Sequence, residues 1–546
     1  MQRVSSNNET TDRQGITMMF IRPLLFFLFI YTSIINIVAQ TPITDANFYD
    51  AIEECLSTNP VDGLCYSCQY GAMPNWDVSL VTDMNNAFSH RQYFNSDISN
   101  WDVSSVTDMS YMFSYSGFDH NIASWDVSNV TDMSHMFSSS GFNQNISSWN
   151  VSNVSDMSWM FSWDFNFNQD IGSWDVSNVT NMSWMFFYAW NFNQDIGSWN
   201  VSNIANMAYM FYHAEIFNQD IGTWDVSNVT DMAGVFSSCC YFNQDIGNWD
   251  VSNVSTMKGM FENASSFNQD ISSWDVDSVT DMSYMFSCSA FNQDISNWDM
   301  SNVTDMSHMF SWDLNFNQDI GSWDVSNVSN MKGMFDNARS FNQDITDWDV
   351  SSVTDMSYMF SSSAFNQNIS SWNVSNVSDM SWMFCGTLLF NQDIGNWDVS
   401  KVTNMDYMYR YASSFNQDIS GWCVENIPSE PQEFSKECPL LPEYHPHWGE
   451  PCDTTGIISN FKNNVVHIYP NPAIGEINIE LPDDLKGNDL FIRIFDETGI
   501  LLSERYANSS LNPIKMNCSF IKPGLYFIYI NMNTKIQSIE KIIILR

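Results

Sequence analysis

An acidic side chain follows most members of a long series of evenly spaced tryptophans. The residue after the tryptophan is Asp in eleven of fifteen copies, Asn in three and Cys423 in the last. Carboxylates repeated at a fixed spacing can bind divalent cations such as calcium, or attract a basic partner by electrostatic steering. The candidate ligand-binding residues are Asp102, Asp126, Asp175, Asp225, Asp250, Asp275, Asp299, Asp324, Asp349 and Asp398.

A structural interpretation of the same acidic residues is also open. On neighbouring strands about 4.8 Å apart, adjacent carboxylates repel by roughly 1 kcal/mol in water. Hydrogen bonds from the flanking Ser or Asn, together with salt screening, would offset that repulsion without a ligand. We favour this structural account and expect no cofactor. If the acidic residues instead bind a cation, we expect it to be calcium.

Other groups that could do chemistry are sparse. Cys65-x-x-Cys68 has the spacing of half a zinc site, but no second pair lies at metal spacing, so we expect no metal centre. His135 and His308 occupy a position where sister copies carry Tyr or Trp, which indicates a variable, solvent-facing position rather than a catalytic base. A catalytic carboxylate pair needs one distinct environment, whereas each Asp here has many near-equivalents. We predict that the protein is not an enzyme.

Charge divides the chain into two regions. The 546 residues include 63 Asp and Glu against 19 Lys and Arg, a net charge of −44 that argues against binding to nucleic acid or an anionic membrane. From Trp76 to Ile427 there are 41 acidic and six basic residues, a net of −35, whereas residues 461–546 carry nine of each. A domain boundary is expected between these regions.

The tryptophans define the organisation of the acidic region. Fifteen copies from Trp76 to Trp422 recur every 24 or 25 residues. Such a period is typical of a solenoid, in which each unit buries its apolar face against its neighbours. We predict a repeat solenoid of about 14–15 repeats over residues 76–427. Its length should be on the order of 70 Å for steps of about 4.8 Å.

The unit FNQDIGSWDVSNVTNMSWMFFYAWN at 167–191 illustrates the expected coil. The I-x-x-W-x-V pattern ending at Val176 alternates as a short strand requires. The M-x-x-M-F pattern from Met182 has the i, i+3, i+4 spacing of a short helical turn, which Thr180 or Asn181, or the Asp of sister copies, would cap. The Asn of FNQDI is expected to form a hydrogen-bond ladder between coils, with calcium binding as the alternative.

The N-terminal segment, residues 1–39, has the pattern of a secretory signal peptide. An arginine precedes an apolar run that ends at the expected cleavage site, Ala39-Gln40, and the true start is expected at Met18 or Met19. A transmembrane helix is the alternative, but the run is shorter than about 20 residues.

Caps are expected at residues 40–75 and, together with a linker, at residues 428–460. The apolar ends of a coil stack must be covered, and a disulfide worth about 2 to 4 kcal/mol in each cap would suit an oxidising compartment. Because eleven cysteines is an odd number, at least one is unpaired or pairs with another chain. The candidate disulfide cysteines are Cys55, Cys65 and Cys68 in the first cap and Cys423, Cys438 and Cys452 in the second.

The region 461–546 has a different pattern. Period-two apolar runs such as VVHIY, FIRIF and LYFIYI are separated by Gly, Pro and Asn. This pattern predicts about seven short strands in a small all-β, immunoglobulin-like antiparallel sandwich.

The repeat I-x-x-W-D-V-S-N-V-T-D-M-S-x-M-F, followed by F-N-Q-D-I, resembles the BspA-like leucine-rich-repeat surface proteins of bacteria, first described as a domain of unknown function abundant in mycoplasmas. The resemblance covers about residues 76–427 and extends to cap-like segments on either side. It implies a leucine-rich-repeat-like fold in a secreted or surface-exposed recognition protein, with some relatives acting as adhesins. It implies no catalytic chemistry.

The C-terminal region resembles the type A sorting domain of the type IX secretion system of Bacteroidota. The Y-P-N-P opening, the D-E-T-G turn, the P-G-L-Y-F strand and the basic, aliphatic end carry this resemblance. It implies contact with the type IX secretion machinery and export to the extracellular space or outer-membrane surface of a Gram-negative bacterium. The segment K-M-N-C-S-F lacks the acidic residue usual before the glycine turn.

Three functions remain as hypotheses. We favour adhesion or protein recognition through an elongated face, with no nucleic-acid partner and no transmembrane helix in the mature chain. A structural cell-surface component is the second hypothesis. The third, glycan binding, would require exposed rings such as Trp163, Trp190 and Trp312 to form a platform, but Trp163 and Trp312 occupy the same position several repeats apart.

Overall fold

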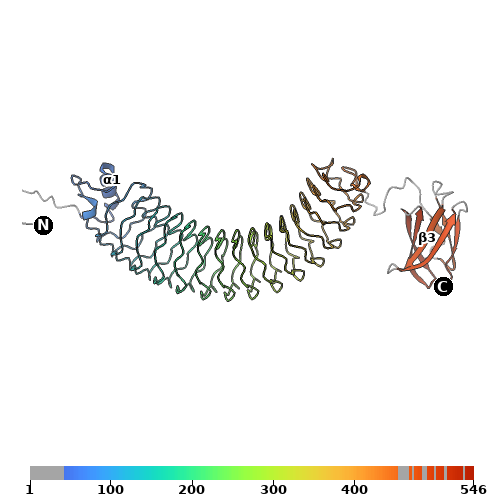
Figure 1. The fold of residues 1–546 in the computed structure, drawn as a ribbon, viewed down its shortest axis with the longest axis horizontal. Helices are drawn as coiled ribbons and strands as arrows, with labels where there is room; N and C mark the ends of the chain where they lie inside the picture. The colour runs from blue at the N-terminus through green and yellow to red at the C-terminus, as the bar shows by residue number, and fades with distance from the viewer. Residues whose placement is uncertain are drawn as a thin grey trace, which may run out of the picture.

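The computed structural model describes residues 42–452 and most of the C-terminal region, and the predicted signal peptide with its Ala39-Gln40 cleavage site lies outside the described residues. Within the first range, successive coils of 24 or 25 residues stand side by side along a curved array (Figure 1). The other described ranges are 467–469, 473–481, 489–496, 500–508, 513–532 and 535–545.

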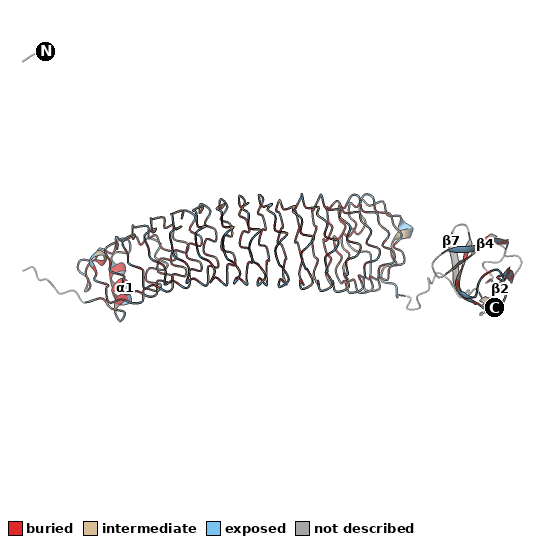
Figure 2. Cartoon of the chain, turned by 90° about the horizontal axis from the view of Figure 1, so that it is seen from below, coloured by how far each residue is buried: buried red, intermediate tan, exposed pale blue. Residues whose placement is uncertain are grey.

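Each coil is a series of tight turns that direct apolar residues inward. In one coil the Trp174 N–H donates to the Ile171 carbonyl at 3.1 Å, and the Val179 N–H donates to the Val176 carbonyl at 2.9 Å. The side chains of Ile171, Trp174, Val176 and Val179 are all buried. Figure 2 shows buried residues in coils along the whole array.

The repeat tryptophans lie inside the array, as the sequence predicts. All fifteen, from Trp76 to Trp422, are only 3–4 % exposed. Their indole N–H groups are satisfied between coils, as where Trp199 Nε1 donates to the Ile171 carbonyl at 3.1 Å. The predicted Asn ladder is also confirmed, because Asn168 Oδ1 accepts the N–H of Asn193 in the next coil at 3.0 Å.

The predicted strand at W-x-V is wrong. Parallel bridges between coils instead lie at the residue before the first Met of each unit, as between Asn181 and Asn206. There the Thr180 N–H donates backward to Ser155 at 2.9 Å and the Met182 N–H donates forward to Asn206 at 3.1 Å. The W-x-V segment alternates buried and exposed side chains but forms no strand among the described coils.

The predicted helical turn at M-x-x-M-F is also wrong. Trp184 and Tyr188 have φ values of 62° and 58°, in the left-handed region, where a right-handed helix has about −60°. Alternate N–H groups of the segment, those of Trp184, Phe186 and Tyr188, donate to carbonyls of the next coil at 2.9, 2.9 and 2.7 Å. Such alternation bonds the segment to its neighbour, whereas a helix would turn the N–H groups back onto itself.

Caps close both ends of the coil stack. Helix α1 (Phe48–Thr58) buries Phe48 against the first coils, and a one-turn helix η1 (Met73–Asn75) follows it. At the other end lies η2 (Pro442–Tyr444), with the Phe434 ring packed on Trp448 at 4.9 Å. Disulfides join Cys65 to Cys68 and Cys423 to Cys452. Of the remaining candidate cysteines, Cys55 and Cys438 carry free thiols.

Two antiparallel sheets make up the described C-terminal region, with orders β1-β2-β5 and β4-β3-β6-β7. Isoleucines from both sheets, such as Ile479 and Ile528, share one apolar core. No helix in the described ranges is both long and apolar enough to cross a membrane. The strands are β1 (His467–Tyr469), β2 (Glu476–Glu480), β3 (Asp489–Asp496), β4 (Leu501–Asn508), β5 (Ile514–Asn517), β6 (Gly524–Met532) and β7 (Lys535–Ile544).

Candidate recognition surface

All ten predicted acidic residues are exposed and have the same local geometry. Each accepts a hydrogen bond from the backbone N–H two residues further on, at 2.9–3.2 Å. The carboxylate therefore closes the turn after the tryptophan. Asn200 accepts the same bond from the N–H of Ser202 at 3.2 Å, so a neutral amide can also close the turn.

Hydrogen bonds to the flanking serines stabilise the charged form of several of these acids. The Ser128 hydroxyl and N–H hold the pKa of Asp126 below its ordinary value, and Ser177 does the same for the pKa of Asp175. In the described ranges, no group of three or more His, Cys, Asp and Glu side chains has an arrangement that could hold a metal ion. The row is thus a set of exposed, turn-closing carboxyl groups that contributes to the net negative charge of the array.

A second surface feature is a pair of columns of stacked aromatic rings. The first aromatic column comes from the x position of M-S-x-M-F, and the second comes from the position four residues later. Both positions have left-handed backbone, which costs about 1 kcal/mol or more for a residue other than Gly. The first column runs through Tyr111, His135, Trp159, Trp184 and Tyr209, with successive ring centroids 4.1, 5.2, 4.5 and 4.2 Å apart.

Stacking corrects the interpretation of the histidine positions as simply solvent-facing. His135 lies between the rings of Tyr111 and Trp159 and is half-buried. Burial there lowers its pKa to about 4, so the imidazole is neutral at pH 7. His308 likewise stacks on Tyr284 at 4.7 Å.

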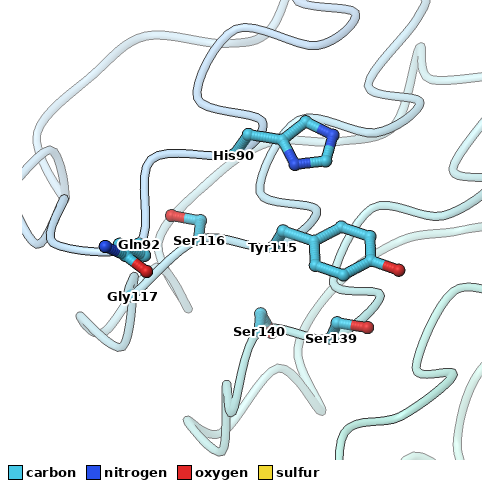
Figure 3. A pocket seen from close by; sticks show the side chains of 7 residues that line it. All are labelled: His90, Gln92, Tyr115, Ser116, Gly117, Ser139 and Ser140. Atoms are coloured by element: carbon cyan, nitrogen blue, oxygen red, sulfur yellow. The ribbon is translucent and has the colours of Figure 1, made fainter.

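The second aromatic column is interrupted. Figure 3 shows His90 and Tyr115 side by side on successive coils, with Ser139 next, at the edge of a polar pocket. The column resumes at Trp163, which stacks on Tyr188 at 4.1 Å, and Tyr188 stacks on His213 at 4.4 Å. Both columns carry rings on three consecutive coils, those of Trp159, Trp184 and Tyr209, whereas elsewhere in the described array such a ring pair stands on a single coil, as at Tyr407 and Tyr411.

Those coils form what we call the aromatic patch. Two of its members, Phe165 and Trp190, lie beside the second column with ring centroids 4.4 Å apart. Trp163, Phe165 and Trp190 are 39 %, 36 % and 41 % exposed, unusually open for side chains of this size. The patch consists of Trp159, Trp163, Phe165, Trp184, Phe187, Tyr188, Trp190, Tyr209, Tyr212 and His213.

Sequence reasoning named Trp163 and Trp190 but missed the platform they belong to. It compared Trp163 with Trp312, which lies six coils further along and is 48 % exposed. The partners of Trp163 are Tyr188 in the next coil and Phe165 on its own coil. Reading each position down consecutive repeats, rather than searching for further tryptophans, would have found the stack.

Comparison with known proteins addresses both regions. Residues 467–545 match a secretion system C-terminal sorting domain, which implies contact with the type IX machinery and export to the cell surface or extracellular space. No curated protein and no solved structure matches the chain. The repeats match the family described as "Mycoplasma protein of unknown function, DUF285" over residues 64–162, 138–239, 189–290, 214–311, 274–364 and 345–440. Because these matches together run from residue 64 to residue 440, more than half of the chain, the protein belongs to the DUF285 family.

Proposed function

We propose that the protein is an exported, non-enzymatic recognition protein that binds a protein ligand at the surface of a Gram-negative cell or outside it. The array is proposed to be a leucine-rich-repeat-like solenoid of the BspA-like class. The observation that carries the proposal is the aromatic patch, because large exposed rings clustered on a polar surface are typical of interaction sites. The sorting domain supports an extracellular place of action.

The acidic row supports the same proposal in a different way. Its carboxylates are exposed, and none of the ten takes part in an ion pair within the described residues. An unneutralised surface of one sign speeds the approach of oppositely charged partners and discourages acidic ones. The row therefore biases which ligands approach the array, while the aromatic patch offers the desolvated contact.

Two other functions make different predictions. A structural surface component would need no ligand, and its patch would have no effect on binding to anything. A glycan-binding protein would use the patch as a stacking platform for sugar rings, an arrangement favoured by the near-parallel Trp163 and Tyr188.

The test is binding of the full chain to panels of matrix proteins, glycans and whole cells. We expect saturable binding to a protein on at least one panel, and a loss of at least tenfold in affinity when Trp163 and Trp190 are both replaced by Ala. Trp312→Ala is the matched control, because Trp312 is at least as exposed as Trp163, at 48 % against 39 %, and occupies the same repeat position. Failure on all three panels would leave the structural role standing.

A further inference from the structure

One arginine lies over the two aromatic columns at the far end of the array. The Arg410 guanidinium carbon is 5.4 Å from the ring centroid of Tyr407, in the first column, and 4.8 Å from that of Tyr411, in the second. It is also 5.9 Å from the ring of Trp382 in the preceding coil. The Glu433 carboxylate lies 2.8 Å from Arg410 Nε. A guanidinium thus sits between columns of rings, with a carboxylate beside it.

The aromatic patch repeats this arrangement without a cation of its own. Aligning the repeats places Trp184 where Tyr407 stands and Tyr188 where Tyr411 stands. Their backbones share the same left-handed conformation, with φ between 58° and 62°. The residue aligned with Arg410 is Phe187, whose ring lies 4.6 Å from that of Trp184. The patch therefore presents more ring surface than the Arg410 site and no positive charge.

Charge around the patch is predominantly negative, with Lys258, which interacts with Glu262, at its edge. Between Gln92 and Met257 the sequence contains seventeen Asp and Glu and no Lys or Arg. Carboxylates lie close enough to interact electrostatically with patch rings, Glu215 with His213 and Glu262 with Tyr209 and Tyr212. Aromatic faces and carboxylates together favour a cation, and arginine most of all because its flat guanidinium stacks on rings.

We infer that the aromatic patch docks an arginine-rich segment of a partner protein, with guanidinium groups lying over the exposed rings of Trp163 and Trp190. This inference rests on the proposed function and names the chemistry of its partner. Because Phe187 fills the place that Arg410 holds at the other end of the array, the arginines of the segment lie over the outer, exposed rings, and nearby carboxylates pair with the arginines that overhang them. Binding is accordingly expected to weaken as salt is added.

The experiment measures binding of the full chain to a fluorescent peptide in which four arginines alternate with serine. Two further probes are the same peptide with glutamine in place of arginine and a neutral cellohexaose. We expect the arginine peptide to bind and the glutamine peptide not to. The variant carrying Trp163→Ala and Trp190→Ala should lose about tenfold in affinity for the arginine peptide, the effect of removing exposed cation–π contacts.

Two controls separate stacking from general attraction. Trp312→Ala removes a tryptophan at least as exposed outside the patch and should change affinity less than twofold. Trp163→Tyr with Trp190→Tyr keeps the rings and should retain binding within about threefold. Circular dichroism and melting of each variant verify that the array is folded.

Three results would overturn the inference. In the first, peptide binding is unaffected by the double alanine variant, which indicates diffuse attraction to the acidic surface. In the second, cellohexaose binds and the arginine peptide does not, which identifies a sugar platform. In the third, neither probe binds while a panel protein binds through Trp163 and Trp190, in which case the proposed function stands and the cationic partner fails. If no panel protein or cell binds, the proposed function itself fails.

Discussion

The indole Nε1 of Trp174 donates a hydrogen bond to the carbonyl oxygen of Ile146, 3.2 Å away in the preceding coil. The same carbonyl also accepts the backbone N–H of Trp149 at 3.1 Å, so each isoleucine carbonyl both closes its own turn and links two coils. The bond satisfies the indole N–H, which would be costly to bury without an acceptor, and it links neighbouring coils in a way that Phe or Leu at the same position could not.

Trp174→Phe should lower the free energy of unfolding by about 2–3 kcal/mol, because it removes both the inter-coil bond and part of a buried ring. Urea unfolding followed by circular dichroism measures the effect. Trp163→Phe changes an exposed ring and should stay within about 0.5 kcal/mol of the unchanged chain. Equal stability of the two variants would contradict the role assigned to the indole N–H.

Asp313→Asn should stabilise the protein at pH 8. Burial raises the pKa of Asp313 to about 7 from an ordinary value of 3.8, although the carboxylate accepts the N–H of Asn315 at 3.1 Å and the Ser289 hydroxyl at 2.9 Å. The stability from its protonated form is fully present below pH 4 and is lost as the pH rises through 7. Asn stays neutral, so above pH 8 the free energy of unfolding of the Asn variant should exceed that of the unchanged chain by at most about 4 kcal/mol.

Melting curves at pH 4 and pH 8 check this dependence, and the advantage of the Asn variant should vanish at the lower pH. Asp299→Asn should have the opposite effect and lower the stability of the protein at pH 8. Its Ser301 bonds hold the pKa of Asp299 below the ordinary value, so its contribution is present above that range and is lost as the pH falls. A pH-independent effect of Asp313→Asn would show that the carboxyl is not buried as described.

Reduction of the Cys423–Cys452 disulfide should loosen the C-terminal cap of the coil stack. The bond closes a loop of 29 residues, for which the chain-entropy estimate is about 3–4 kcal/mol. Hydrogen exchange in the cap with and without reductant measures the opening. The Cys65–Cys68 bond spans a separation of only three residues, so its removal by serine substitution should cost less.

Asn193→Ala should destabilise the loop ladder by about 1–2 kcal/mol, because Asn193 Oδ1 accepts the Asn218 N–H at 3.0 Å and Gln219 Nε2 at 2.9 Å. Asn193→Asp keeps the acceptor and should be tolerated. The chain already contains this replacement, since Asp119 accepts the Asn143 N–H at 3.0 Å. The denaturant midpoints of the two variants should differ clearly, and identical midpoints would show that the Asn ladder does not stabilise the array.

Asp175→Asn combined with Asp225→Asn should shift the melting temperature by less than about 2 °C, because amides close the same turn in sister coils. Millimolar calcium should likewise leave the melting of the unchanged chain where it is. A rise in melting with calcium that the double variant lacks would restore the cation-binding interpretation of the acidic row.

Much of the interior could be predicted from the period of the sequence alone. Strict spacing places Trp174, Met182 and Phe186 inside, and the structure buries all three. The secondary structure could not be predicted in the same way, because the i, i+3, i+4 spacing of a helix also fits a chain of tight turns. The deciding factor is the left-handed backbone at Trp184, which apolar periodicity does not encode and which inter-coil hydrogen bonds stabilise.

The candidate site was harder to predict than the core. A ring at the x position of one repeat looks like an arbitrary surface substitution. Whether that ring belongs to a stack depends on the residue at the same position one coil away, and a glycine there ends the stack. Tyr209, for example, lies against Gly234, where a Cβ would come within 2.4 Å of the ring. The aromatic patch thus depends on residues in successive repeats, whereas the buried core follows from the pattern within each repeat.

Near-identical bonding from each coil to the next has an evolutionary consequence. Whole units can be duplicated or deleted in frame and still meet matching neighbours, since each contact demands only another copy of the same pattern. The length of the array can therefore change by gain or loss of coils, while substitutions at a few exposed positions change its surface without disturbing the contacts between coils.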